Sequence, residues 1–137
     1  MKIETKIDLA SPAAEVIANL SDPARLQQVL QRLGVVVQPG VQGAPMQASL
    51  RWRGAARRFS ISPASVSGGT VTVRVTAVPA SAILCVTVAD RPGGSTAHAV
   101  TEVKAHTTKA TIAVQSLRLV RGKAQRRLGS LVAAVAG

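Results

Sequence analysis

The chain of 137 residues is long enough for one domain with a single core, and its formal net charge is +11. That charge favours acidic partners such as nucleic acid, anionic lipid or an acidic protein, although a basic composition alone also accounts for it. The chain has a single cysteine, Cys85, which disfavours a disulfide scaffold. It has no run of about 18 uncharged apolar residues, which disfavours a membrane span, and four of its first ten residues are charged, which disfavours a secretory leader. We therefore expect a cytoplasmic protein.

The N-terminal third predicts one strand followed by two short helices. Residues 1–10 alternate between apolar and polar side chains, which is the pattern of a strand with one solvent-exposed face. Ser11-Pro12 and Asp22-Pro23 each place a capping residue before a proline, as at the start of many helices. We therefore expect helices over 13–20 and 24–33, with Gly34 ending the second one.

About six further strands are expected in quick succession. A brief apolar run covers 35–37, and the segments that follow alternate in the same way as the first strand. Glycine pairs or turn residues near 54, 68 and 93 separate them. Antiparallel strands with one apolar and one polar face require a single covering layer.

Residues 107–137 supply that layer. Their apolar side chains recur every three or four residues and predict one amphipathic helix, while the opposite face is basic and the segment contains no acid. Ile112 and Leu119 fall on the polar face and are exceptions to the pattern. The apolar stripe consists of Ala110, Ala113, Val114, Leu117, Val120, Ala124, Leu128, Leu131, Val132 and Val135.

Short motifs at both ends of the chain resemble a known superfamily. The Ser-Pro-x-x-Glu sequence at 11–15 and Leu-Ser-Asp-Pro at 20–23 resemble the opening of SRPBCC proteins, which include START lipid-transfer, birch-pollen-allergen-like and polyketide-cyclase-like proteins. The stretch 115–128, with Arg-Gly at 121–122 and Arg-Arg-Leu at 126–128, is similar to small bacterial members of unassigned function.

The resemblance implies an α+β helix-grip fold over a single domain, 1–137. A curved antiparallel sheet of about six to seven strands would wrap around a long C-terminal helix, with two short helices after the first strand. A cavity between sheet and helix would bind a small apolar or amphipathic molecule. The side chains expected to line it are Trp52, Phe59, Val73, Val86, Leu117, Arg121 and Leu128.

Arg121 is a polar residue within the apolar stripe. Its guanidinium could meet the carboxylate or phosphate of an amphipathic ligand at the cavity mouth. Alternatively, its aliphatic stem packs while the guanidinium reaches water at the edge of the groove. The sequence leaves both interpretations open.

No arrangement of residues predicts catalysis, a metal site or a cofactor. His98, His106 and Cys85 lack the spacing of convergent metal ligands, and no two acids are paired. A nucleophile elbow and a glycine-rich phosphate loop are both absent from the sequence. Ligand binding without chemistry is therefore expected.

The alternative function is a basic interaction module. Its C-terminal helix would dock on an acidic protein, RNA or an anionic membrane surface. Arg51, Arg53, Arg57 and Arg58 flank one predicted turn and also suggest nucleic acid. With only two aromatic residues in the chain, stacking platforms for bases are scarce, so a solvated arginine-rich hairpin is favoured.

Overall fold

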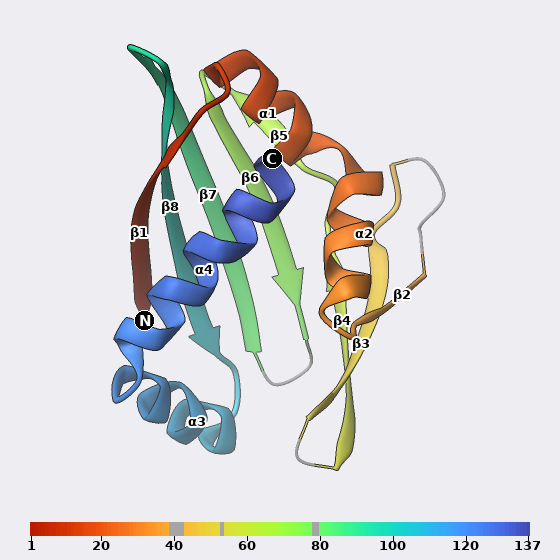
Figure 1. The fold of residues 1–137 in the computed structure, drawn as a ribbon. Helices are drawn as coiled ribbons and strands as arrows, with labels where there is room; N and C mark the ends of the chain where they lie inside the picture. Colours follow the sequence, from red (N-terminus) through yellow and green to blue (C-terminus); the bar gives the residue numbers. More distant parts are fainter. Residues whose placement is uncertain (39–42, 53, 78–79) are drawn as a thin grey trace.

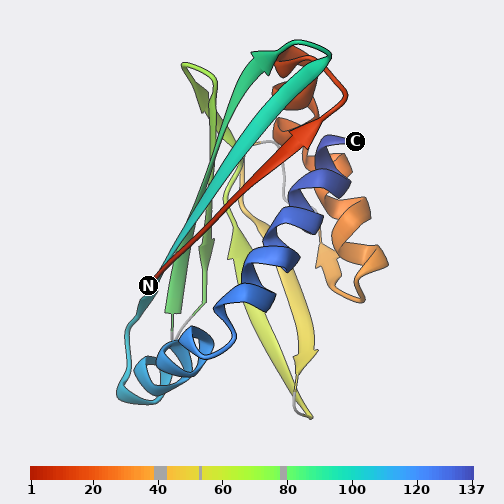
Figure 2. The same cartoon turned by 60° about the vertical axis from the view of Figure 1, so that its left-hand side comes forward.

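A computed structural model describes residues 1–38, 43–52, 54–77 and 80–137, except for the side chains of Trp52 and Leu117. Its helices lie on one face of a curved antiparallel sheet (Figure 1, Figure 2). The elements in order are β1 (Lys2–Leu9), α1 (Ala13–Ser21), α2 (Pro23–Arg32), β2 (Val36–Gln38), β3 (Met46–Trp52), β4 (Ala55–Ile61), β5 (Ser65–Ser67), β6 (Thr70–Thr76), β7 (Ala80–Arg91), β8 (Gly94–Ala105), α3 (Thr108–Arg118) and α4 (Arg121–Ala136).

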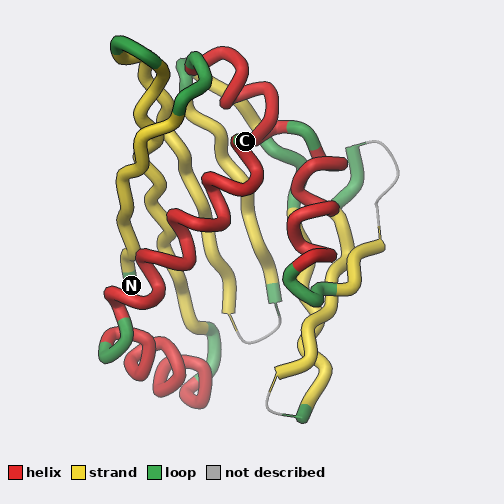
Figure 3. Tube along the Cα trace, viewed as in Figure 1, coloured by secondary structure: helices red, strands yellow, loops and turns green. Residues whose placement is uncertain are grey.

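The strands form one sheet in the order β1-β8-β7-β6-β4-β3-β2, with the short β5 paired to β6. All of these pairings are antiparallel, and β1 joins the last strand rather than its neighbour in sequence. The described residues thus form eight strands, and β5 is one that the sequence analysis did not identify. The expected sheet and covering helices are confirmed (Figure 3).

The two short helices are present, but only one has the expected cap. The side chain of Asp22 accepts a hydrogen bond from Ala24 N at 3.0 Å, and Pro23 is the first residue of α2. The Ser11 side chain does not cap α1, contrary to our expectation. Instead Asp90, at the end of β7, accepts a 2.7 Å hydrogen bond from Ala13 N. A tertiary contact therefore satisfies an amide that the sequence assigned to a local cap.

The prediction of one continuous helix over 107–137 was wrong. The chain forms α3 and α4, separated at Leu119 and Val120. Because α3 begins soon after the end of β8, it lies beyond the end of the sheet, and the break turns the chain back so that α4 crosses the sheet face (Figure 1). In the part of the chain that the structure describes, no helix is long and apolar enough to span a membrane.

The core consists of two hydrophobic clusters. The first lies between α1, α4 and strands β7 and β8, and its most buried members include Val16, Ala97 and Val132. The second lies between α2 and strands β2 to β4 and includes Leu30, Met46 and Ile61. Two clusters under one layer of helices leave room for a space between them.

Candidate ligand-binding cavity

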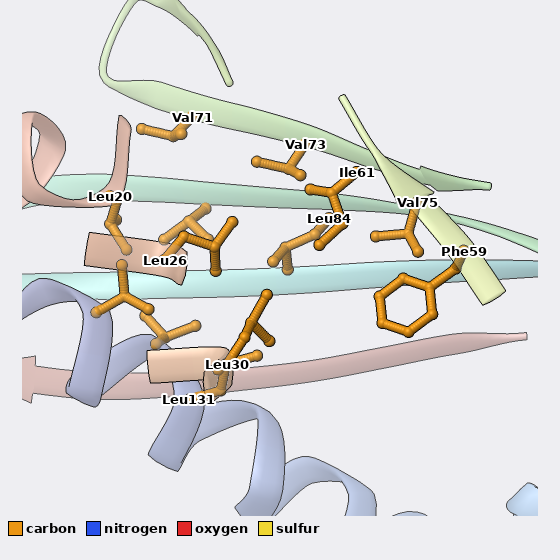
Figure 4. Close-up of a pocket in the computed structure, with 13 residues that line it drawn as sticks. Leu20, Leu26, Leu30, Phe59, Ile61, Val71, Val73, Val75, Leu84 and Leu131 are labelled. Carbon is orange, nitrogen blue, oxygen red and sulfur yellow. The ribbon is translucent and has the colours of Figure 1, made fainter. Parts of the chain in front are cut away.

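A cavity of about 240 Å³ lies between the two hydrophobic clusters (Figure 4). Helices α1, α2 and α4 and strands β4, β6 and β7 all contribute to its wall. The side chains that line it are Leu20, Leu26, Leu30, Phe59, Ile61, Val71, Val73, Val75, Leu84, Val86, Leu131, Val132 and Val135. Every one of these side chains is a hydrocarbon.

The position of the cavity follows from how α4 approaches the sheet. At Gly129 the helix lies so close to β1 that an added Cβ would be 3.3 Å from Ile7 Cγ2. The small residues Ala97 and Ala99 of β8 are buried members of the first hydrophobic cluster, which also contains Val132 of α4. On the other side, β4 and β6 pair through only two residue pairs. The short valine side chains of β6 line the cavity there.

A second pocket of about 390 Å³ adjoins the cavity at the junction of α1 and α2. The two share Leu20, Leu26, Ile61 and Val73 as lining residues. Unlike the cavity, this pocket also has polar side chains in its wall, namely Ser21, Asp22, Gln27 and Ser62. An apolar body in the cavity could therefore extend a polar end into the adjoining pocket.

Several solved structures share this architecture. A conserved protein from Geobacillus kaustophilus superposes with a TM-score of 0.70 at 14% sequence identity, covering 99% of this chain and 93% of that one. A Chromobacterium violaceum protein gives 0.66 at 20% identity, with 99% and 97% covered. Norcoclaurine synthase from Thalictrum flavum gives 0.66 at 13% identity, with 99% and 84% covered. The chain has the helix-grip fold that these structures share.

The expected helix-grip arrangement is thereby confirmed. At these identities the likeness concerns the fold, and one fold can carry unrelated functions. No family model matches the sequence, and no curated protein matches it significantly. The function of this domain must therefore be argued from its own cavity.

Three of the residues expected to line the cavity do so: Phe59, Val73 and Val86. Leu128 is half-buried against the first cluster and is not among the lining residues. The side chains of Trp52 and Leu117 lie outside the described part of the structure. Part of the expected site is thus brought together by β4, β6 and β7.

Arg121 does not lie at the cavity. It is the exposed first residue of α4, and Leu131, the first α4 residue in the cavity wall, follows ten positions later. Ten residues of helix correspond to about 15 Å. The sequence analysis grouped Arg121 with the apolar stripe because it treated 107–137 as one helix, whereas the chain breaks just before Arg121. The geometry therefore gives no support to Arg121 as a headgroup anchor.

The leucines of α1 and α2 were missed as cavity residues. Leu26 and Leu30 are four residues apart and share a helix face, and Leu20 lies in the last turn of the preceding helix. This spacing was visible in the sequence. What the sequence did not contain was the direction of α2, which places that face over β4 and β6 rather than over α1 (Figure 1).

Among the described residues that line the cavity, none can act as acid, base or nucleophile. None of its side chains is titratable, and within the described residues no three His, Cys, Asp or Glu side chains gather where they could bind a metal ion. Cys85 is half-buried in β7, and it is not one of the lining residues. The site can therefore bind by shape and by removal of apolar surface from water.

Proposed function

We propose that the protein binds a small apolar molecule in the cavity between the sheet, α2 and α4, without transforming it. The observation that carries this proposal is the wall itself, in which all 13 lining residues are aliphatic or aromatic hydrocarbons. Apolar surface moved from water into such a site gains about 25 cal/mol per Å². The synthase among the structural neighbours indicates that the fold accommodates catalysis, but this cavity offers no reactive side chain.

The volume sets the class of ligand. An engineered cavity of about 150 Å³ in another protein binds benzene, so about 240 Å³ has room for roughly ten non-hydrogen atoms, the size of a fused two-ring hydrocarbon. A polar group buried there without a partner would cost about 1–3 kcal/mol. The ligand is therefore neutral within the cavity, and any polar end occupies the adjoining pocket beside Gln27 and Ser62.

Native mass spectrometry of protein purified from its own cells tests the proposal. We expect a co-purifying molecule in the size range above, released on denaturation. Val73→Phe places a larger side chain in the cavity wall and should abolish the additional mass, whereas Val66→Phe, on the exposed surface of β5, should retain it. An additional mass that persists in Val73→Phe would place the ligand elsewhere. A wild-type protein that neither carries a molecule nor binds added naphthalene would contradict the proposed function.

A further inference from the structure

One end of the molecule carries exposed basic side chains from two distant parts of the chain. Helix α3 and the tip of the β3–β4 hairpin project at the same end of the sheet in both views (Figure 1, Figure 2). We call this surface the basic end and define it by seven exposed side chains. These are Arg51, Arg57 and Arg58 of the hairpin, Lys109 and Arg118 of α3, and Arg121 and Lys123 of α4.

The basic end also exposes aliphatic side chains. Leu119 is 89% exposed, Ile112 is 61% exposed and Val120 is 47% exposed. Among the described side chains of α3, Ala110 is buried, and Ile112 lies about 160° from it around the helix, so Ile112 points away from the protein. Leu119 and Val120 lie just beyond the last residue of α3, in the break before α4. Ile112 and Leu119 are the two exceptions in the sequence pattern, and we call these three exposed aliphatic side chains the apolar tip.

The chain segments that supply this end contain no acids. The sequence contains no Asp or Glu over 23–89 or over 103–137, the segments that supply the basic end. Within the residues that the structure describes, the ion pairs are Arg91 with Asp8 and His98 with Glu4, and neither uses a side chain of the basic end. The positive potential of this surface is therefore available to a partner.

We infer that the basic end docks on an anionic lipid bilayer, with Leu119 and Ile112 entering the interface and the surrounding Lys and Arg side chains contacting lipid headgroups. Exposed aliphatic side chains beside cations are the combination that an amphipathic segment uses at a membrane surface. Each Lys or Arg near an anionic leaflet contributes about 1 kcal/mol. This inference is independent of the ligand in the cavity.

Two other acidic partners fit the surface less well. Single-stranded nucleic acid is bound by basic grooves with aromatic platforms, and among the side chains that the structure describes at this end the exposed apolar ones are aliphatic. A stable protein interface buries about 1,200 Å² or more of surface around well-packed anchors, which three aliphatic side chains at a helix end do not supply. A bilayer needs no complementary shape, so a small apolar tip within a basic surface is sufficient.

Co-sedimentation with sucrose-loaded vesicles tests the inference. One vesicle is phosphatidylcholine alone and the other contains phosphatidylglycerol as well. We expect the wild-type protein to sediment with the anionic vesicle only, and to be released at about 1 M salt, where the Debye length is about 3 Å. A mixture of the protein with single-stranded RNA, run on a native gel, provides the comparison with nucleic acid.

Matched double variants separate the apolar contribution to vesicle binding from the electrostatic one. Ile112→Ser with Leu119→Ser should weaken vesicle binding about tenfold, because apolar contact with the interface is lost. Arg118→Gln with Arg121→Gln should weaken it about fivefold for each charge removed. The controls change the same residue types elsewhere: Leu33→Ser with Val66→Ser, and Arg32→Gln with Arg74→Gln. All eight side chains are exposed, so every variant should remain folded by circular dichroism.

Binding that is lost in the α3 and α4 variants and kept in the controls would support the inference. Three results would overturn it: no binding to anionic vesicles, equal losses in variants and controls, or binding that the Ile112 and Leu119 substitutions leave unchanged. RNA binding without vesicle binding would assign the basic end to nucleic acid instead.

Discussion

Arg25 Nε donates a hydrogen bond to the carbonyl oxygen of Val135 at 3.0 Å, joining α2 to the end of α4. Asn19 Nδ2 donates similarly to Ala136 O at 2.8 Å from α1. The last carbonyls of a helix lack partners within it, so these two side chains satisfy groups that would otherwise need water. Val135 lines the cavity, and so does Leu26, the residue after Arg25. The hydrogen bond between Arg25 and Val135 therefore joins two parts of the cavity wall.

Arg25→Met should lower the free energy of unfolding by about 1.5 kcal/mol, because it keeps the packed stem and removes a hydrogen bond from a charged donor. Urea denaturation followed by circular dichroism measures the change. Arg32→Met on the same helix is the matched control, because Arg32 is exposed and has no such partner among the described residues. Equal effects in the two variants would show that the Arg25–Val135 contact does not stabilise the fold.

Val132→Asp should unfold the protein, since Val132 is 2% exposed between α4 and the sheet. A carboxylate there would be buried without a partner, at a cost of several kcal/mol. Ala133→Asp introduces the same charge one residue along, on the exposed face of α4, and should leave the melting temperature nearly unchanged. A stable Val132→Asp variant would mean that this face of α4 does not form the core.

Gly129→Leu tests the close approach of α4 to β1. Even a Cβ at this position would be 3.3 Å from Ile7 and 3.6 Å from Thr5 Oγ1, so a leucine would force the helix away from the sheet. We expect a loss of about 1–3 kcal/mol, the usual range for overpacking. Gly122→Leu, at the exposed start of α4, is the control and should be nearly neutral in thermal unfolding.

Much of the fold was accessible from the sequence because strand alternation and proline-marked helix starts are local signals. The first strand, both short helices and the Gly68–Gly69 turn appear where these signals placed them. The break at Leu119 and Val120 was not accessible in this way, because it depends on where β8 ends relative to the sheet. The cap of α1 was missed for a similar reason, since Asp90 is 77 residues away from Ala13.

The candidate site was accessible only in part. Strand parity indicated that Phe59 and Val73 face inward, and Val86 belongs to a continuous apolar run; all three line the cavity. Arg121 was placed with them by a helical wheel that extended across the break. The cavity itself depends on the short pairing of β4 with β6 and on the path of α2, which are properties of the tertiary arrangement and have no local sequence pattern.

Two larger side chains should distinguish empty space from packed core. Val73→Phe extends into the cavity and should leave the free energy of unfolding unchanged or raise it slightly. Val88→Phe enters the first cluster, where Val88 is 6% exposed and not part of the cavity wall, and should cost about 1–3 kcal/mol. Urea denaturation of both variants checks this expectation. Equal destabilisation would indicate that the space beside Val73 does not accept a side chain.

The central claim is that the cavity binds a neutral apolar molecule, and equilibrium dialysis against naphthalene tests it most directly. We expect one naphthalene molecule bound per chain, and no change in its affinity for Arg121→Met, because Arg121 is not among the residues that line the cavity. Val73→Phe should weaken naphthalene binding by at least about tenfold. Naphthalene binding that Val73→Phe leaves unchanged, or no naphthalene binding by the wild-type protein, would contradict the account.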